Sequence, residues 1–491
     1  MAKLHYENEG HIAKISIIAL HLFQILHLFT VSQGVFNFAT CGINSVRRYN
    51  FFNYLYNVLI TVTMKKVFIL LASALVLWGC YKDNTPSAQQ GDWRERPAEF
   101  QDKYKLEQLV VLSRHNIRTP MVGKGSVLTR LTNPAYQWFP WEDPASHLTA
   151  KGERLEAHMG AFFHEWLQNE DFIGRYSANP ASYRFYANAK QRCQKTARTF
   201  ADALLPGSHP EVEMKVEYDT MDPVFNPQIT KISAGFEEKA QREIFSMIGD
   251  LNAGASYQFG LIENIIDITH SPAYPDTTSF SQFPSAIGFK VNAEPYMTGG
   301  LKMACSVADA LVLQYYEEPD VRKAAFGNEL QEVDWTDVAL IVARYQDALF
   351  SSYPVAVNVA HPLLQTMLSE LQMKDRCFTF LCGHDSNIGS VLASLEAVPY
   401  ELPQSIEKKV PIGSKIIVEK FKAKDGTEYA DLWFVYASTT QLREERKMSY
   451  SYPPMAVRLR LNGLNENADG LYLLSDVEQR FSKAIKAYDS I

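Results

Sequence analysis

The sequence has few cysteines and no pair of them at metal-binding or redox spacing. Six cysteines occur among 491 residues, and no Cys-x-x-Cys pair is present, which argues against the common zinc and thioredoxin-like redox motifs. Cys377 and Cys382 lie on one expected strand, and their spacing points them to opposite faces, so we expect no bridge between them. A fold held together by disulfides is not indicated.

Runs of basic residues, internal repeats and low-complexity segments are also missing. The formal net charge is -7, so the surface as a whole repels a polyanion, and no aromatic-basic ladder suggests nucleic acid as a partner. No carboxylate cluster is suited to magnesium, so we expect no metal and no other cofactor. With 46% hydrophobic and 21% charged residues, the chain has the composition of a globular protein with one large domain or two.

The stretch MKKVFILLASALVLWGC, Met64 to Cys80, has the parts of an export signal. Two lysines precede an apolar core, and a glycine precedes the cysteine. The pattern resembles a bacterial lipoprotein signal, in which Cys80 would be acylated, become the first mature residue and anchor the protein to a membrane. Residues 81–104 are polar and contain proline, which predicts a tether.

Residues 1–63 precede this signal, although a signal peptide works only at the true N-terminus. We therefore expect translation to begin at Met64 and residues 1–63 to be an extension outside the functional protein. Two apolar patches, residues 12–31 and 51–62, could instead form a membrane anchor. The predicted localisation is the periplasm or outer membrane of a bacterium.

In the stretch VVLSRHNIRTP, Val110 to Pro120, an apolar run is followed directly by a group of positively charged residues. Arg114 and Arg118 flank His115, and no acidic residue within the stretch neutralises them. Because the guanidinium fork suits phosphate and carboxylate oxygens, this pattern favours an anion-binding site. The alternative is a basic surface turn after an edge strand.

From Lys105 onward, strand-like and helix-like segments alternate, which predicts an α/β fold. Three apolar strands, expected at residues 109–112, 183–187 and 378–382, are each followed by polar or charged residues. The residues that follow them are Arg114, His115 and Arg118, then Arg192, then His384 and Asp385. Ligands bind at the carboxyl ends of parallel strands, so we expect these side chains to share one crevice. Taken singly, Arg192 could be a surface charge, His384 a core histidine and Asp385 a helix N-cap.

These motifs resemble those of the histidine acid phosphatases, a branch of the histidine phosphatase superfamily, from about residue 105 to the C-terminus. The family motif R-H-G-x-R-x-P appears as residues 114–120, and its His-Asp motif as His384 and Asp385. Asn116 replaces the usual glycine, which is similar to the bacterial glucose-1-phosphatases. Further stretches similar to that subgroup are KGSVL (124–128), HLTAKG (147–152), TMDPVFNPQIT (220–230), LQYYE (313–317) and GHDSNI (383–388).

The resemblance implies a three-layer α/β domain with a mainly parallel central sheet, formed by residues 105–222 and 335–491. A largely helical cap, residues 223–334, would be inserted into it. The spacing of apolar residues agrees with this for two cap helices, which we expect at residues 236–251 and 301–317.

The resemblance also implies a mechanism. The three arginines would grip a phosphomonoester, and His115 would attack phosphorus as a neutral imidazole whose pKa the guanidinium charges lower. His384, if protonated, would donate a further hydrogen bond to the phosphoryl group. Asp385 would protonate the leaving group, which requires acid pH or a raised pKa, and would then activate water to hydrolyse the phosphohistidine.

Two further residues bear on the substrate. Glu294 matches a glutamate that faces the substrate in the glucose-1-phosphatases, and Met121 would narrow the mouth of the pocket. A carboxylate accepts sugar hydroxyls but repels a second phosphate, which favours glucose 1-phosphate over a fully phosphorylated inositol. A phytase, a broad-specificity acid phosphatase and a phosphosugar-binding lipoprotein without activity are the alternatives, and Glu294 could also be a solvated cap residue.

Overall fold

The computed structural model describes residues 93–491 apart from residues 95, 98, 122–125 and 177–178. The predicted start at Met64, the signal, the lipid site at Cys80 and residues 81–92 of the tether lie outside the described residues. Residues 124 and 125 of the KGSVL stretch also lie outside them. No helix in the described part is long and apolar enough to span a membrane.

An eight-stranded sheet forms the centre of the domain, in the order β10-β8-β7-β1-β6-β2-β3, with β9 paired to β8. The strands are β1 (Tyr104–Arg114), β2 (Tyr183–Ala187), β3 (Val212–Glu213), β6 (Phe378–Gly383), β7 (Lys415–Ala423), β8 (Glu428–Tyr436), β9 (Met455–Arg458) and β10 (Tyr472–Leu473). Strands β1, β6, β2 and β3 run parallel, and β7 to β10 add antiparallel pairs. The predicted α/β class is confirmed.

The three predicted strands lie side by side in the parallel half. Arg114 of β1 is opposite Gly383 of β6, and Ala187 of β2 is opposite Cys382, so the three carboxyl ends meet at one edge. Strand β2 has the predicted bounds, whereas β1 begins before the predicted residue 109. The polar residues at the start of β1 belong to the strand because they pair with β7. The local sequence pattern does not reveal this pairing.

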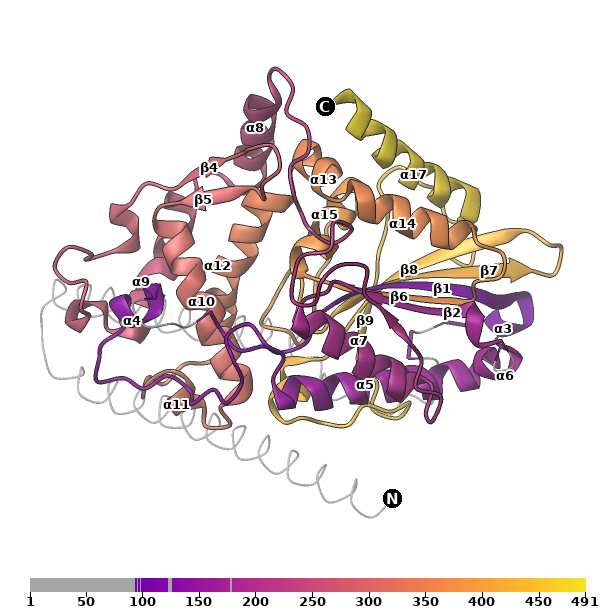
Figure 1. Ribbon diagram of the computed structural model, residues 1–491, viewed down its shortest axis with the longest axis horizontal. Coiled ribbons are helices and arrows are strands. Elements are labelled where there is room, and N and C mark those ends of the chain that lie inside the picture. The colour runs from indigo at the N-terminus through magenta and orange to yellow at the C-terminus, as the bar shows by residue number, and fades with distance from the viewer. Residues whose placement is uncertain (1–92, 95, 98, 122–125, 177–178) are drawn as a thin grey trace, which may run out of the picture. The chain divides into compact units, whose positions relative to one another are not determined.

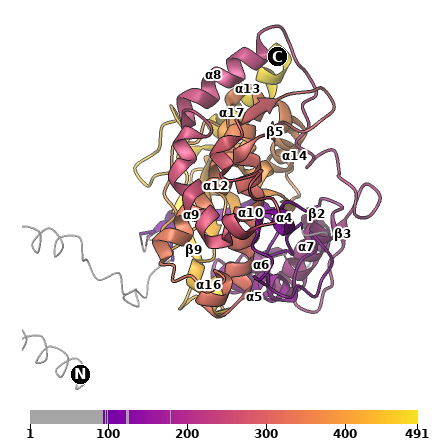
Figure 2. The same ribbon diagram turned by 90° about the vertical axis from the view of Figure 1, so that its left-hand side faces the viewer.

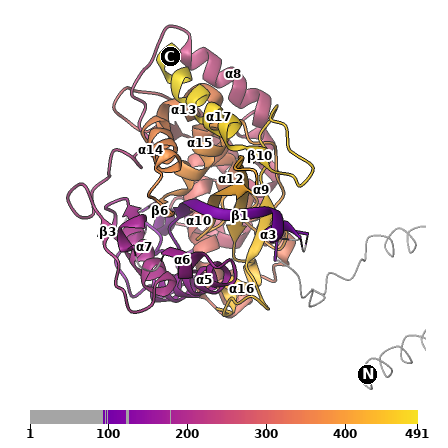
Figure 3. The ribbon, with the colours of Figure 1, turned by 90° about the vertical axis from the view of Figure 1, so that its right-hand side faces the viewer.

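Helices cover both faces of the sheet. Leu109 and Val111 belong to one core cluster with residues of α5 (Ala150–Asn169) and α7 (Gln191–Leu204). Val110 and Leu112 point the other way, as alternation along a strand requires, into a second cluster that residues of α14, α15 and α17 share. These helices are α14 (His361–Gln372), α15 (Asp385–Ser394) and α17 (Leu474–Ala487). Figure 3 shows β1 between α14 and α17 on one side and α5 on the other.

A mainly helical region, the cap, lies beside this three-layer domain (Figures 1 and 2). Its elements are α8 (Phe236–Ile248), α9 (Ser256–Ile266), β4 (Ala286–Gly288), β5 (Tyr296–Thr298), α10 (Gly300–Glu317), α11 (Val321–Ala324) and α12 (Glu332–Phe350). The two predicted cap helices correspond to α8 and α10. Helix α12 packs against α8, α9 and α10, so the expected end of the cap at residue 334 falls inside a helix of the same packing unit.

The described part of the predicted tether packs against the domain. Trp93 stacks edge-on against Trp166 with ring centroids 5.3 Å apart, and Arg94 pairs with Glu170 at 2.8 Å. Arg94 and Arg96 both pair with Glu419 of β7, whose side chain is fully buried. Helix α3 (Phe100–Lys103) then leads directly into β1, so the folded domain begins earlier than the expected residue 105.

Candidate active site

The carboxyl ends of β1, β6 and β2 bring the predicted anion-binding and catalytic residues together. His115 follows β1 and His384 follows β6, and their ring centroids lie 5.5 Å apart. Arg192 stands in the first turn of α7, and its Nη2 lies 3.4 Å from Nδ1 of His384. Asp385, the first residue of α15, lies 3.5 Å from Nη2 of Arg114. The predicted residues therefore lie close together, although they come from three separate parts of the chain.

His115 is buried among these residues, and one of its ring nitrogens is engaged in a hydrogen bond. Its Nδ1 lies 2.8 Å from the main-chain oxygen of Asn116. Since a carbonyl only accepts, Nδ1 carries the hydrogen and Nε2 keeps a lone pair. Burial lowers the pKa of His115 well below its usual value, and Arg192, His384 and the two other arginines lower it further. The imidazole therefore stays neutral in mild acid.

Each arginine of the RHNIR motif has an acidic partner. Nη1 of Arg114 donates to Oε1 of Glu407 at 2.8 Å, and Glu407 also accepts from the hydroxyl of Tyr316 at 3.1 Å. Nη2 of Arg118 lies 3.0 Å from both carboxylate oxygens of Asp309 on α10. These carboxylates fix the two guanidinium groups and offset part of their charge.

Arg192 stands differently, because its close contacts are with a ring nitrogen and a carbonyl. Its Nη1 lies 3.5 Å from the main-chain oxygen of Ser146, and burial lowers its pKa. Among the described residues no carboxylate pairs with Arg192, so its charge is the one in this site that an incoming anion would offset most.

His384 is oriented by Asn188. The side-chain oxygen of Asn188 accepts from the Asp222 N–H at 3.1 Å, so its amide nitrogen faces Nε2 of His384, at 2.8 Å. Nε2 therefore accepts this hydrogen bond, and Nδ1 faces Nη2 of Arg192, which is also a donor, at 3.4 Å.

Asp385 differs from one sequence expectation. Desolvation raises the pKa of its carboxyl, but Arg114, His384, the Ser386 N–H and Arg118 outweigh this, and the pKa lies below its ordinary value. Oδ2 also accepts from Nε2 of Gln346 on α12 at 2.6 Å. We expected Asp385 to be protonated through either acid pH or a raised pKa, and a raised pKa is wrong for the free protein. The sequence does not reveal the cationic neighbours that lower the pKa.

The two predicted substrate residues have different positions. Glu294 lies between β4 and β5; desolvation raises its pKa, and His384, Asp385 and Arg192 are among the charges that act on it. Its carboxylate therefore lies near enough to these three residues to interact with them electrostatically. Met121 is 68% exposed, and among the contacts of the described residues none places it against the arginines or histidines.

Sequence reasoning missed the supporting residues Asp309, Gln346, Glu407 and Asn188. Asp309 and Gln346 interrupt otherwise apolar faces of α10 and α12, and a polar residue on a buried helical face is the signal that could have found them. Glu407 stands in a loop between α15 and β7, where no periodicity marks it. Asn188 follows β2 directly, as His115 follows β1.

The cysteines and acidic residues of the described part form no further site. Cys193, Cys305, Cys377 and Cys382 are free thiols, and Sγ of Cys193 lies 3.9 Å from both ring nitrogens of His384. Within the described ranges, no group of three or more His, Cys, Asp or Glu residues is arranged to hold a metal ion.

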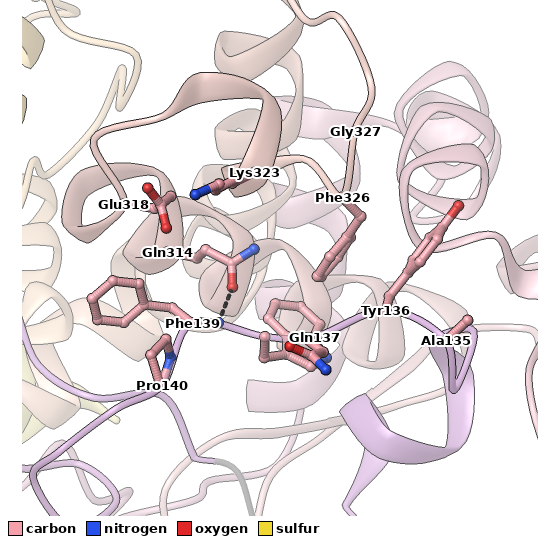
Figure 4. A pocket seen from close by; sticks show the side chains of 11 residues that line it. Ala135, Tyr136, Gln137, Phe139, Pro140, Gln314, Glu318, Lys323, Phe326 and Gly327 are labelled. Atoms are coloured by element: carbon pink, nitrogen blue, oxygen red, sulfur yellow. Dashed lines mark hydrogen bonds between the residues drawn. The ribbon is translucent and has the colours of Figure 1, made fainter.

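A separate cavity of about 480 Å³ opens between the segment 135–140 and helices α10 and α11 (Figure 4). Aromatic side chains line much of it, and the Phe139 N–H donates to Oε1 of Gln314 at 2.6 Å. None of the predicted site residues is among its lining residues, so the chemistry suggested by the motifs lies elsewhere.

Comparisons with known proteins agree with the motifs. The family model described as "Histidine phosphatase superfamily (branch 2)" matches residues 105–234. A glucose-1-phosphatase of Salmonella typhimurium is 35% identical over 394 residues, covering 78% of this chain and 93% of the relative. The phytase AppA of Escherichia coli is 24% identical and covers 79% of this chain and 94% of its own.

The fold also matches solved structures. The phytase of Hafnia alvei, solved with myo-inositol hexakis sulphate, aligns with a TM-score of 0.71 and 24% identity, over 79% of this chain and 98% of the phytase. The fold, the strand-end motifs and the similarity to the Salmonella enzyme over most of both chains agree. The chain belongs to branch 2 of the histidine phosphatase superfamily and is a histidine acid phosphatase.

Proposed function

We propose that the protein hydrolyses phosphomonoesters, preferably a sugar phosphate such as glucose 1-phosphate, through a phosphohistidine on His115. The observation that carries this is the state of the ring. Nδ1 of His115 donates to the main-chain oxygen of Asn116, which leaves the lone pair on Nε2, and burial together with three arginines lowers the pKa of the ring well below its usual value. A neutral nucleophile surrounded by cations is suited to attack on an anionic phosphate.

Binding would begin with the arginines. A phosphomonoester dianion placed between Arg114, Arg118 and Arg192 would accept hydrogen bonds to its nonbridging oxygens, and His384 would add another donor. Attack by Nε2 then forms an N–P bond while the bond from phosphorus to the ester oxygen breaks. The electron pair of that bond leaves with the alcohol, which needs a proton.

Asp385 would supply that proton. Its pKa is low in the free protein because cations surround it, and a bound dianion would offset those cations and raise the pKa towards the protonated state. Acid pH favours the same state. Once the alcohol has left, the carboxylate would remove a proton from water, which attacks the phosphohistidine and releases phosphate.

The preference for a sugar monophosphate is supported by Glu294 and by the glucose-1-phosphatase relatives. A carboxylate facing the site would accept hydroxyl groups and repel a second phosphate. The phytase neighbours support the alternative, an inositol polyphosphate phosphatase or a broad-specificity enzyme. Turnover of glucose 1-phosphate and inositol hexakisphosphate at several acid pH values separates the two. We expect the higher kcat/KM for glucose 1-phosphate, and the reverse order would overturn the assignment.

We also propose that the protein is exported and held by a lipid on Cys80. The lipoprotein-like segment 64–80 supports this proposal. After cleavage at Cys80, only a short stretch would separate the lipid from Trp93, the first described residue that packs against the domain. The enzyme would then work close to the membrane surface on small phosphomonoesters outside the cytoplasm.

A further inference from the structure

We propose that a buried chain of three residues, Lys415, Glu156 and Asn116, holds His115 in the geometry of a nucleophile. Asn116 and Glu156 are then positioning residues that act through the peptide group between Asn116 and Ile117. The inference deepens the proposed function and rests on the assignment of His115 as the nucleophile.

The chain begins with an ion pair inside the protein. Lys415, the first residue of β7, and Glu156 of α5 have fully buried side chains, and Nζ lies 2.8 Å from Oε1. Nζ also donates to Oγ of Ser113 at 3.1 Å and to the carbonyl of Gly413 at 3.0 Å. Because an unpaired buried charge is costly, each partner fixes the other in place. The Glu156 carboxylate is therefore a rigid anchor beneath the β1 strand end.

Asn116 is bound to this anchor. Its Nδ2 donates to Oε2 of Glu156 at 2.9 Å, and its Oδ1 accepts from the Ile117 N–H at 2.9 Å. The main-chain N–H of Asn116 donates to Oγ1 of Thr196 at 3.2 Å. A Cβ at Gly413 would lie 2.6 Å from Nδ2 of Asn116, so only glycine leaves room for the amide there. The side chain of Asn116 and the peptide groups on both sides of it are therefore fixed.

The peptide group between Asn116 and Ile117, whose N–H is held by Oδ1 of Asn116, orients His115. Its carbonyl accepts from Nδ1 of the ring at 2.8 Å, and the Gly413 N–H donates to the carbonyl of His115 at 3.2 Å. The Asn116 side-chain amide is thus connected to a buried ion pair on one side and, through the peptide group between Asn116 and Ile117, to the nucleophile on the other. Loss of the Asn116 side chain removes the hydrogen bond that holds this peptide group. The tautomer of His115 and the direction of its Nε2 lone pair are then no longer fixed.

Asn116→Ala tests this chain against a matched control. Asn133→Ala removes an asparagine that also donates to a carboxylate, that of Asp267 at 2.8 Å, and accepts from a main-chain N–H at 2.8 Å, away from the strand ends. We expect Asn116→Ala to slow the burst of product in rapid-mixing kinetics by about 10- to 100-fold, as misplacement by about 1 Å can do. Phosphate affinity by calorimetry should change less than threefold, roughly, because the arginines remain.

Nitrogen NMR of labelled histidine supplies a readout that a merely structural role would not move. We expect His115 to be protonated on Nδ1 in the wild type and to populate both tautomers in Asn116→Ala. If Asn116→Ala does not fold, Asn116→Ser, whose hydroxyl is too short to reach Glu156, takes its place.

An unchanged burst rate, an unchanged tautomer, or an equal loss of activity in Asn133→Ala would each overturn the proposal. The His115→Ala variant distinguishes a failure of this positioning proposal from a failure of the proposed function. If that variant keeps turnover, the nucleophile assignment fails, whereas the tautomer comparison still decides whether Asn116 positions the ring.

Discussion

The carboxylate of Asp309 holds Arg118 through both of its oxygens, each 3.0 Å from Nη2 of the guanidinium. Arg118 comes from the loop after β1 and Asp309 from the cap helix α10, so a cap residue directly modulates the charge of the phosphate site. Removing that charge has a measurable consequence for anion binding.

Asp309→Asn should bind inorganic phosphate more tightly, by about tenfold, which corresponds to about 1.4 kcal/mol. The reason is that a carboxylate beside a bound dianion opposes binding at short range. Competitive inhibition by phosphate measures the effect. Asp337→Asn, on cap helix α12 where Asp337 accepts from Gln258, is the matched control. Unchanged or weaker phosphate inhibition in Asp309→Asn would show that Asp309 mainly orients Arg118.

His115→Ala should abolish turnover while phosphate still binds, because the nucleophile is lost and the three arginines stay. Turnover assays and calorimetric titration with phosphate check both halves. His164→Ala is the control, since Nδ1 of His164 also contacts a main-chain carbonyl, that of Leu204, at 2.7 Å. Substantial residual activity in His115→Ala would mean that the covalent route is wrong.

Acid should destabilise the wild type more than His115→Asn. The pKa of His115 is lowered in the folded protein, so below about pH 6.5 the unfolded chain binds a proton that the folded chain does not. Stability is therefore lost as pH falls from that value towards the folded pKa, by up to about 1.4 kcal/mol per pH unit. Urea unfolding of both proteins at neutral and acid pH measures the difference. An identical pH dependence would show that the ring charges freely.

Asp385→Asn should slow the burst on glucose 1-phosphate by about 10²–10⁴-fold, the usual worth of general acid catalysis. On p-nitrophenyl phosphate the burst should suffer far less, because p-nitrophenolate leaves without a proton. The burst must be followed by rapid mixing, because steady-state rates also depend on hydrolysis of the phosphohistidine. Asp385 is assigned a second role in that hydrolysis. Equal losses on both substrates would assign the proton to another group.

N-terminal analysis of the native protein should find an acylated Cys80 as the first residue. The reason is the signal-like order of charged, apolar and small residues in segment 64–80. Mass spectrometry of the mature protein distinguishes this from the alternative. A peptide from residues 1–63 in the mature protein would contradict the assignment.

The strand ends were predictable because each is local. A buried strand, a turn and a helix fall within about 20 residues in each case, and the charged residues between them need no distant information. The site residues Arg114, Arg192 and Asp385 therefore emerge from sequence pattern together with the rule that ligands bind at carboxyl ends of parallel strands.

The partners of these residues were not predictable in the same way. Glu407 is separated from Arg114 by 293 residues, and Lys415 from Ser113 by 302. Such pairs depend on how β7 and the cap pack against β1, which no local periodicity encodes. The pKa of Asp385 shows the same limit, because its direction is set by neighbours that only the fold brings close.

Trapping the covalent intermediate tests the central claim most directly. Enzyme mixed with radioactively labelled glucose 1-phosphate is quenched in alkali within the burst, digested and analysed by mass spectrometry. The mechanism predicts a phosphoryl group on Nε2 of His115, stable in alkali, labile in acid and absent from His115→Ala. A phosphoryl group on another residue, or a full burst of product with no labelled peptide, would contradict it.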